Sequence, residues 1–375
     1  MELGGAQRST LDLLSSLDPR EFELELIASP QGLLAEEASQ IPHLRFVPDP
    51  SLVRQIHPVN DARAFQSLRH RLRRTRPHCV HTHSPKAGIL GRFAAAAAGV
   101  PNIVHTVHGW SFNRFQPAPL RSLFLNLERQ AARVTNSLVT VSEADQTLGL
   151  NQGIGKRQQY ELIRYGIDFE RFFSHPNGQA RAKAALGWSP KNLVVGAVSC
   201  LKAQKAPMDL VRAFELIARA VPEARFVWAG DGVFRKRVER ALWFKGLHEK
   251  TRLLGWSRDI PELLCAMDVY VLGSLWEGFP VSVLEAMRQA KAVVVSNTGG
   301  VSEVIKHGVN GYLVEPGDWG ALAGYTIRLL KEESLRRSFE EKAAQSVDSA
   351  YTQEAFVSRT AELYRRAGEP VPCIL

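Results

Sequence analysis

The stretch that decides the fold is SLWEGFPVSVLEAMRQAKAVVVSNTGGVSEVIKHGVNGYLVEPGD, residues 274–318. Two carboxylates in it, Glu277 and Glu285, lie eight positions apart. Pro280 suits the first turn of a helix, so we expect a helix to begin near it, with Glu277 in the preceding loop and Glu285 in the second turn. A helix start carries free N–H groups and a partial positive charge, and both favour a bound phosphate.

The spacing of the two carboxylates suits an elongated ligand. A helix rises about 1.5 Å per residue, so Glu285 lies several ångströms deeper along the axis than Glu277. One carboxylate could hold a group on one side of a phosphate, and the other a group beyond it. A nucleotide sugar has this form, because its diphosphate lies between a hydroxylated sugar and a ribose.

The same stretch resembles the retaining glycosyltransferases of family 4, which have the GT-B fold. Their E-x7-E element matches Glu277 to Glu285, their EGFP matches residues 277–280, and their EAM matches residues 285–287. Their downstream pattern GG..E.I..G.NG.LV.PGD matches residues 299–318. The resemblance implies that Glu277 touches the transferred sugar and that Glu285 binds the nucleotide ribose. Two glutamates alone would fit an ordinary acidic loop and helix, and it is the flanking matches that favour the family.

Length and composition are those of a globular protein with two domains. The chain has 375 residues, of which 45% are hydrophobic and 23% charged. No apolar run reaches the roughly 20 residues of a membrane-spanning helix, and no secretion signal opens the chain. The four cysteines are scattered without a CxxC pair, which is typical of a reduced compartment and not of a structural zinc site. We therefore expect a cytoplasmic protein.

The positive charge of the chain favours an anionic partner. The net charge is +9 and the pI is about 9.5. The densest basic run, RHRLRRTR, extends from Arg69 to Arg76 at the end of a helix expected from near Asp61. It fits a solvated helix end, where the dipole favours cations, and it also fits contact with an anionic membrane on the cytoplasmic face. No zinc-finger or RNP motif accompanies it, so nucleic acid is not an expected partner.

Strand and helix patterns alternate through both halves of the chain, without a tight hairpin signal. The clearest strands are predicted at residues 22–29, 43–48, 102–107, 137–142 and 192–199. Such alternation predicts parallel α/β sheets. With the family resemblance, we expect two Rossmann-like parallel-sheet domains that face a cleft, the GT-B fold.

The start of the chain departs from the resembled family. There a buried strand precedes a GGAQ-like turn, whereas here only residues 1–3 precede Gly4 and Gly5. We therefore expect the N-terminal sheet to lack its first strand. The family uses this turn to approach the donor diphosphate, so Gly4 and Gly5 are candidate donor-binding residues, although a plain strand-to-helix turn would explain them too. At the other end, we expect residues 373–375 to be frayed.

The expected domain boundaries follow breaks in the pattern. Residues 1–165 form the expected N-terminal domain, which would bind the acceptor. Residues 166–190 are rich in turn formers and read as a linker, and residues 191–350 form the expected nucleotide-sugar-binding domain. The resemblance implies that a last helix, residues 352–367, crosses back onto the N-terminal domain.

A cation lies where the second domain would bind a diphosphate. Lys205 follows the first strand of that domain. The resembled family has an Arg five positions earlier, where this chain has Cys200, and a thiol cannot replace the donors of a guanidinium. Either Lys202 compensates in part, or the diphosphate relies more on backbone amides. The further candidate donor-binding residues are Gly278, Phe279, Pro280, Val281, Gly255 and Trp256, of which the last two face either the nucleotide base or solvent.

Histidines follow two of the predicted strands. The family has a His near the transferred sugar at a loop position that matches His108, so His108 and Glu277 are the candidate catalytic residues. His81 and His83 share one face of a strand, a spacing that could bind a metal. No Asp or Glu lies close to them in the sequence, so we expect them to line the cleft. We expect no metal and no other cofactor.

Together these features predict a metal-independent, retaining glycosyltransferase. D-x-D, P-loop and GxGxxG motifs are absent, which argues against metal-dependent transferases of the other large architecture, P-loop enzymes and nicotinamide dehydrogenases. The expected partners are a nucleotide-sugar donor and a glycan or lipid-linked acceptor of polysaccharide or cell-envelope biosynthesis. Two alternatives stay open: a nucleotide-sugar epimerase or hydrolase of the same fold, and a catalytically impaired nucleotide-sugar-binding protein, which Cys200 and the missing strand would favour.

Overall fold

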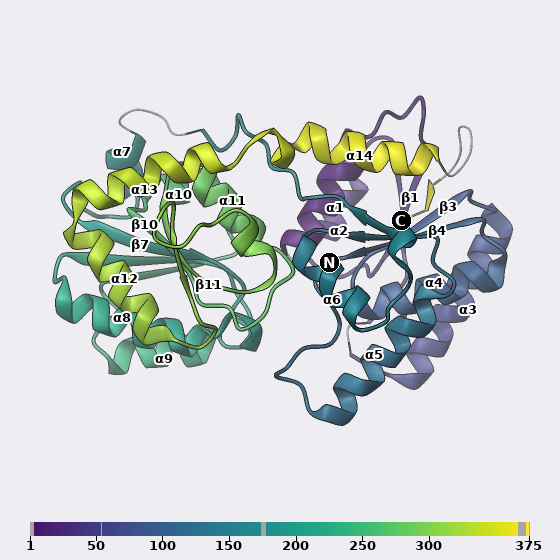
Figure 1. Ribbon diagram of the computed structural model, residues 1–375, viewed down its shortest axis with the longest axis horizontal. Helices are drawn as coiled ribbons and strands as arrows, with labels where there is room; N and C mark the ends of the chain where they lie inside the picture. The colour runs from purple at the N-terminus through teal and green to yellow at the C-terminus, as the bar shows by residue number, and fades with distance from the viewer. Residues whose placement is uncertain (1–3, 54, 174–177, 367–372, 375) are drawn as a thin grey trace. The chain divides into compact units, whose positions relative to one another are not determined.

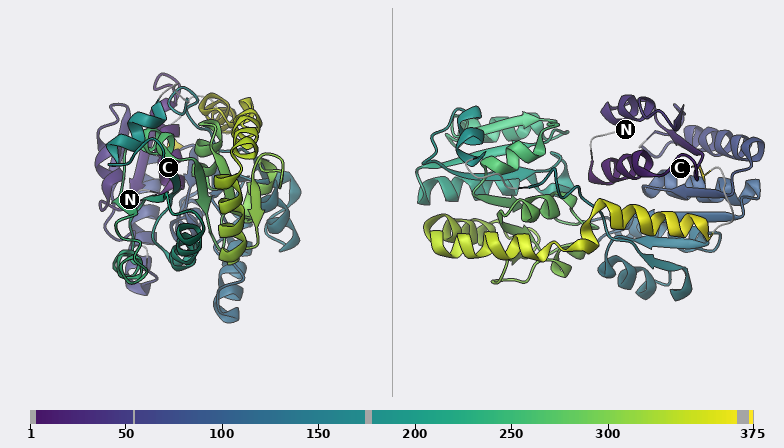
Figure 2. Two further views of the ribbon diagram at one scale, coloured as in Figure 1. Left: turned by 90° about the vertical axis from the view of Figure 1, so that its left-hand side faces the viewer. Right: turned by 90° about the horizontal axis from the view of Figure 1, so that it is seen from above.

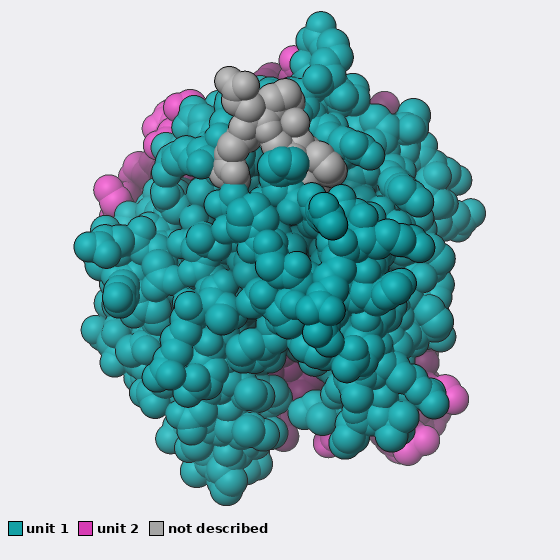
Figure 3. Space-filling view, turned by 90° about the vertical axis from the view of Figure 1, so that its right-hand side faces the viewer, with its two compact units in different colours: residues 1–166, 353–375 teal, residues 167–352 magenta. Residues whose placement is uncertain are grey.

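Strands and helices alternate along the chain (Figure 1). The strands form two sheets, and the strands within each sheet are parallel. The computed structural model describes residues 4–53, 55–173, 178–366 and 373–374. The chain divides into two compact units, which Figure 3 colours separately. Unit 1 comprises residues 1–166 and 353–375, and unit 2 comprises residues 167–352. The expectation of two Rossmann-like parallel-sheet domains is confirmed.

The sheet of unit 1 has the strand order β2-β1-β13-β3-β4-β5-β6, and all of its described pairs are parallel. Its strands are β1 (Leu24–Ala28), β2 (Leu44–Pro48), β3 (Cys79–Thr82), β4 (Asn102–Val107), β5 (Ser137–Thr140), β6 (Tyr160–Leu162) and β13 (Cys373–Ile374). Its helices are α1 (Gly5–Ser16), α2 (Leu33–Ser39), α3 (Pro58–Thr75), α4 (Pro85–Ala98), α5 (Ala118–Ala132), α6 (Glu143–Asn151) and α14 (Gln353–Arg365), with a 3-10 turn η1 (Arg157–Gln159).

One strand of this sheet comes from the far end of the chain. Among the described residues, which begin at Gly4, no strand precedes α1. The position between β1 and β3 is taken by β13, where Cys373 pairs with Leu24 on one side and with Cys79 on the other. The expectation of a frayed end was therefore wrong for residues 373–374. The open edges of β1 and β3 carry backbone donors and acceptors that need partners, and β13 supplies them.

The sheet of unit 2 has the strand order β12-β11-β10-β7-β8-β9, and its strands are also parallel. They are β7 (Leu193–Val198), β8 (Ala224–Ala229), β9 (Thr251–Gly255), β10 (Val269–Leu272), β11 (Ala292–Ser296) and β12 (Tyr312–Val314). The helices are α7 (Gly178–Ala185), α8 (Pro207–Ala220), α9 (Arg235–Phe244), α10 (Ile260–Ala266), α11 (Val281–Arg288), α12 (Trp319–Lys331) and α13 (Glu333–Ser346), with 3-10 turns η2 (Ala203–Lys205), η3 (Gly299–Glu303) and η4 (Ser349–Tyr351).

Helices cover both faces of each sheet (Figure 2), and this explains the apolar character of the strands. Strands buried on both faces are continuously hydrophobic, as in the AVVVS of β11, in which all five residues are buried. The core of unit 2 is centred on three aromatic residues that are fully buried, Phe214, Phe226 and Trp228.

Residues 167–190, which we expected to form a linker, group with unit 2. Their helix α7 packs on α10, and its Lys183 is 3% exposed. The Lys183 ammonium donates to Asp268 Oδ2 at 2.8 Å and to the carbonyl of Asn192 at 2.8 Å. The turn formers of this stretch gave no sign of the buried contacts that the short helix α7 makes.

A buried ion pair joins α4 to α5 in unit 1. Arg92 is 0% exposed and Glu128 is 2% exposed, and Arg92 Nη2 lies 2.7 Å from Glu128 Oε2. Arg92 Nε also donates to the carbonyl of Gly88, and Ser111 Oγ donates to Glu128 Oε1 at 3.0 Å. The pair therefore anchors the loop after β4, which carries His108.

We expect the Glu128→Leu variant to lose about 3–5 kcal/mol of unfolding free energy, because it leaves a buried guanidinium without its counter-charge. The double variant Arg92→Met/Glu128→Leu should recover much of that loss. Urea unfolding followed by far-UV circular dichroism measures both. The exposed pair of Glu333 and Arg337 serves as the control, and Glu333→Leu should cause no measurable change. Equal stability of Glu128→Leu and the wild type would contradict the prediction.

Candidate active site

The helix expected near Pro280 is α11, for which Pro280 is the N-cap. Glu277 lies in the loop between β10 and α11, and Glu285 lies within the helix. The side chain of Pro280 makes no capping hydrogen bond to the first N–H groups of α11. The first N–H groups of a helix lack partners within it, so this start can receive an anion.

Two backbone segments pack directly against each other beside this helix start. The amide of Gly300 donates to the carbonyl of Gly278 at 2.8 Å. Gly299 has a φ of +56°, and a Cβ built on it would lie 2.0 Å from the carbonyl oxygen of Gly278. Only glycine fits there. The loop after β11 thus supports the loop that carries Glu277.

Lys205 and Glu277 come together at the edge of the sheet of unit 2. Lys205 ends η2, which follows β7, and its ammonium forms an ion pair with Glu277 Oε1. The two side chains are 15% and 8% exposed. The strand order reverses between the neighbouring strands β7 and β10. In open α/β sheets, ligands bind outside the carboxyl ends of the strands at such a reversal.

Gln204 is a site residue that the sequence analysis missed. Its Nε2 donates to the carbonyl of Trp276 at 2.9 Å and to Glu277 Oε2 at 3.3 Å. Its own carbonyl accepts from the amide of Leu275 at 2.8 Å. A glutamine beside a lysine in a loop matches no sequence motif. Only the pairing of β7 with β10, which brings their following loops together, could have indicated that Gln204 contacts Glu277.

Both glutamates influence Tyr270, a buried residue of β10. Burial raises the pKa of the Tyr270 hydroxyl, and the carboxylates of Glu285 and Glu277 raise it further, while a hydrogen bond to Ser282 opposes the shift. The Tyr270 and Ser282 oxygens are 2.7 Å apart. Because Ser282 lies in the first turn of α11, this bond fixes the helix start to the sheet.

The remaining donor-site candidates of unit 2 lie along the same edge. Phe279 is buried, with its ring 6.1 Å from that of Tyr351. Gly255 ends β9 with a φ of +69°, and Trp256 follows it, half-buried. Cys200 is a half-buried free thiol in the loop after β7. Lys202 is on the same loop, at the N-cap of η2.

In unit 1, Gly4 is the N-cap of α1 and Gly5 is its first residue. Gly4 has no side chain with which to cap the helix. The side chain of Gln7 lies against Gly4, since a Cβ built on Gly4 would lie 2.5 Å from Gln7 Oε1.

His108 is held by partners on both ring nitrogens. Its Nε2 lies 2.8 Å from His83 Nδ1, and its Nδ1 is hydrogen-bonded to the hydroxyl of Tyr165. The His108 ring is nearly parallel to the rings of His83 and Tyr165, at centroid distances of 5.1 and 5.7 Å. Burial lowers the pKa of His108 well below its ordinary value and that of His83 to about 4, so both rings are neutral at pH 7.

We expected His81 to line the cleft, but its side chain is buried, with 2% of the residue exposed. Its Nδ1 lies 2.6 Å from the hydroxyl of Tyr364 and its Nε2 lies 2.7 Å from that of Thr106. His81 thus joins β3 to β4 and α14. Within the described residues, no group of three or more His, Cys, Asp and Glu side chains could hold a metal ion.

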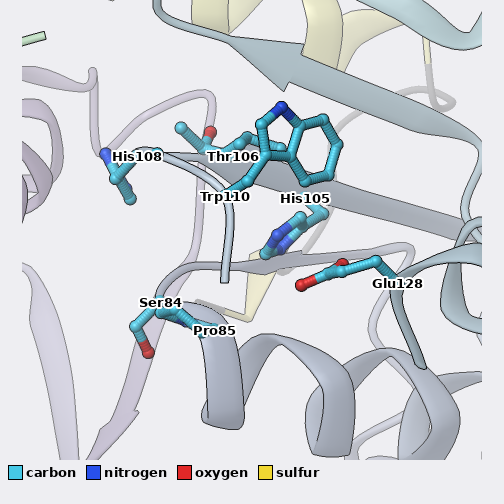
Figure 4. A pocket seen from close by; sticks show the side chains of 9 residues that line it. Ser84, Pro85, His105, Thr106, His108, Trp110 and Glu128 are labelled. Carbon is cyan, nitrogen blue, oxygen red and sulfur yellow. The ribbon is translucent and has the colours of Figure 1, made fainter. Parts of the chain in front are cut away.

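A small pocket lies beside these histidines in unit 1 (Figure 4). It is lined by Ser84, Pro85, His105, Thr106, Val107, His108, Gly109, Trp110 and Glu128. In this view, His108 and Ser84 lie on one side and His105 and Glu128 on the other. The pocket opens beside the ends of β3 and β4, which carry His83 and His108.

Some side chains of the basic run at the end of α3 form hydrogen bonds within unit 1. Arg71 forms two 2.5 Å hydrogen bonds with the buried carboxylate of Glu25, and Arg73 donates to the carbonyl of Ala97. The side chains of Arg73, Arg74 and Arg76 remain exposed. Only part of the run therefore faces solvent.

Comparison with known proteins identifies the family. Residues 3–171 match the model of "Glycosyltransferase Family 4", and residues 179–346 match that of "Glycosyl transferases group 1". A relative from Escherichia coli is 32% identical over 89% of this chain and 86% of its own length. The chain belongs to glycosyltransferase family 4. In its described part, no helix is long and apolar enough to cross a membrane.

The named relatives of this glycosyltransferase are transferases. The E. coli protein is the "UDP-Gal:alpha-D-GlcNAc-diphosphoundecaprenol alpha-1,3-galactosyltransferase". A Campylobacter jejuni protein, 27% identical over 76% of both chains, is the "N,N'-diacetylbacillosaminyl-diphospho-undecaprenol alpha-1,3-N-acetylgalactosaminyltransferase". Among solved structures, Anabaena HepE in complex with UDP and glucose matches with a TM-score of 0.81 at 22% identity over 96% of both chains. WaaG, a glycosyltransferase of lipopolysaccharide biosynthesis, matches with a TM-score of 0.79 at 14% identity, again over 96% of both chains. These structures confirm the GT-B fold.

We expect Gly299→Ala to weaken binding of the nucleotide-sugar donor by about tenfold or more, because the new methyl group would displace the loop that supports the start of α11. Calorimetric titration measures the effect, with UDP as the first probe because the E. coli relative and the HepE structure carry it in their names. Gly308→Ala is the matched control, since Gly308 also has a positive φ, +75°, but a Cβ there meets nothing within 4 Å. Equal affinities of the two variants for the nucleotide probe would show that the contact with Gly278 is not important for the site.

Proposed function

We propose that this glycosyltransferase transfers a sugar from a nucleotide-sugar donor to a lipid-linked glycan acceptor, with retention of anomeric configuration and without a metal ion. The observation that carries the proposal is the Glu277 carboxylate, held by Lys205 and Gln204 beside the start of α11. Both relatives named above carry diphospho-undecaprenol acceptors in their names, which supports a lipid-linked acceptor.

The donor would bind along the carboxyl edge of the sheet of unit 2. Lys205 and the amides of residues 278–281 would hold the diphosphate, with Glu285 on the ribose and Glu277 on the transferred sugar. The loop of Gly255 and Trp256 would face the base. With Cys200 in place of a cation, the diphosphate would rely on these amides and on Lys202. UDP-galactose is the first donor to test, because the E. coli relative is named for it.

Retention would follow from attack on the same face as the leaving group. The bond between the anomeric carbon and the phosphate oxygen breaks, and a bond to the acceptor oxygen forms. The acceptor's proton passes to the departing phosphate oxygen, so that a nucleoside diphosphate leaves. The Lys205 ammonium and the start of α11 would stabilise the charge that develops on that phosphate, usually the largest contribution to such catalysis.

Unit 1 would bind the acceptor. His108 would approach the transferred sugar, and the helix start at Gly4 and Gly5 would approach the diphosphate. The exposed arginines at the end of α3 would contact an anionic membrane surface on the cytoplasmic face, where a lipid-linked acceptor is anchored. The epimerase, hydrolase and impaired-binder alternatives are not favoured by the relatives, and transfer by the purified chain would exclude all three.

We expect Glu277→Gln to reduce kcat by roughly 10²-fold or more while the affinity for UDP changes little, because the carboxylate acts on the sugar. The assay measures the UDP released during transfer from UDP-galactose to GlcNAc-diphosphoundecaprenol. A panel of other UDP-sugars and GDP-sugars is assayed in parallel as alternative donors. NMR of the product should show an α linkage. Glu249→Gln, at an exposed carboxylate, serves as the control. Nearly full transfer by Glu277→Gln would overturn the assigned role.

We expect dialysis against EDTA to leave the transfer rate within about twofold of the untreated rate, because Lys205 and a helix start supply the positive charge at the diphosphate. Added Mg²⁺ or Mn²⁺ should then have no further effect. A rate that EDTA abolishes and Mn²⁺ restores would show that the reaction depends on a metal ion.

A further inference from the structure

Gln204 makes three contacts with consecutive residues of the loop that carries Glu277. Its carbonyl accepts from Leu275, and its side-chain amide donates to the Trp276 carbonyl and to Glu277 Oε2. An amide nitrogen has two hydrogens, so the Trp276 and Glu277 bonds use both of its donors. We call this set of hydrogen bonds the Gln204 clamp.

The turn that carries Gln204 has a strained backbone. Ala206, directly after η2, has a φ of +43°. Non-glycine residues in this region are strained, because the Cβ crowds the following carbonyl oxygen, and they persist only where the surrounding structure imposes them. The turn places Gln204 and Lys205, two consecutive side chains, on the same carboxylate.

The two partners of Glu277 differ in what a bound diphosphate would do to them. The Lys205 ammonium is charged, so an incoming diphosphate competes with Glu277 for it. The Gln204 amide is neutral and already bonded to a backbone carbonyl, so the diphosphate attracts it far less. When Lys205 turns to the diphosphate, a mostly buried carboxylate would lose its counter-charge and, without another donor, would be costly to keep in place.

We propose that Gln204 is a positioning residue, which holds Glu277 toward the transferred sugar while Lys205 engages the diphosphate. The inference rests on the proposed function of the site. Lys205 and Gln204, the two partners of the Glu277 carboxylate, would therefore act at different steps of the reaction. Lys205 contributes to donor binding, and the Gln204 clamp contributes to the geometry of the reacting complex.

The test is a double-mutant cycle with Gln204→Met, which keeps the length of the side chain and removes its donors. In the wild-type background, kcat with UDP-galactose and GlcNAc-diphosphoundecaprenol should fall by roughly 10²-fold, a typical loss for a misplaced catalytic group. The Kd for UDP should stay within about twofold of the wild-type value. In the Glu277→Gln background, Gln204→Met should change kcat by less than about twofold, because the two residues act as one unit.

Gln179→Met is the matched control, because Gln179 Nε2 makes the same kinds of bond away from the site. It donates to the carbonyl of Met267 at 3.0 Å and to Asp268 Oδ1 at 3.1 Å. This control should keep its kcat. The proposal is overturned if Gln204→Met lowers kcat equally in both backgrounds, since the clamp would then act through the Trp276 carbonyl alone. It is also overturned if Gln204→Met weakens UDP binding by tenfold or more.

Crystal structures of the wild type and of Gln204→Met with bound UDP would show the contact between Gln204 and Glu277 directly, without a measurement of turnover. In the wild type, Gln204 should stay bonded to Glu277 while Lys205 moves to the diphosphate, and in the variant the carboxylate should leave its position. A carboxylate that stays in place in the variant contradicts the positioning role. Failure of the wild type to transfer any sugar of the donor panel would instead contradict the proposed function.

Discussion

The ion pair between Lys205 and Glu277 depends on the reversal of strand order between β7 and β10. Both strands are parallel neighbours, so the loops that follow them leave the sheet at the same edge. The Gln204 clamp joins these two loops, and the backbone contact between Gly278 and Gly299 adds the loop after β11. The candidate donor site is therefore a property of the sheet topology as much as of the residues that line it.

Unit 1 uses neutral hydrogen-bonded rings at the corresponding edge of its sheet. His83, His108 and Tyr165 form one hydrogen-bonded series, and His81 is bonded to Thr106 and Tyr364. Burial keeps the imidazoles uncharged by lowering their pKa values. A charged group buried with them would need a counter-ion, as the buried Arg92 of α4 needs Glu128 of the neighbouring helix α5. This edge thus offers hydrogen bonds rather than charge, which suits the hydroxyl groups of a sugar.

Both ends of the chain contribute to the structure of unit 1. Helix α14 supplies Tyr364 to His81, and β13 occupies the position between β1 and β3. These contacts join residues that are hundreds of positions apart in the sequence. They complete the core of unit 1, whose other elements follow one another along the chain. The grouping of residues 353–375 with unit 1 follows from these contacts.

Much of unit 2 could be predicted from the sequence, because capping, periodicity and turn formation depend on residues close together in the chain. The start of α11 at Pro280, the places of Glu277 and Glu285 around it, and the strand–helix alternation are of this kind. The partners of these residues could not be predicted. Gln204 on Glu277, Tyr165 on His108 and β13 in the sheet are contacts between distant segments, which only the folding of the strands into a particular order brings together.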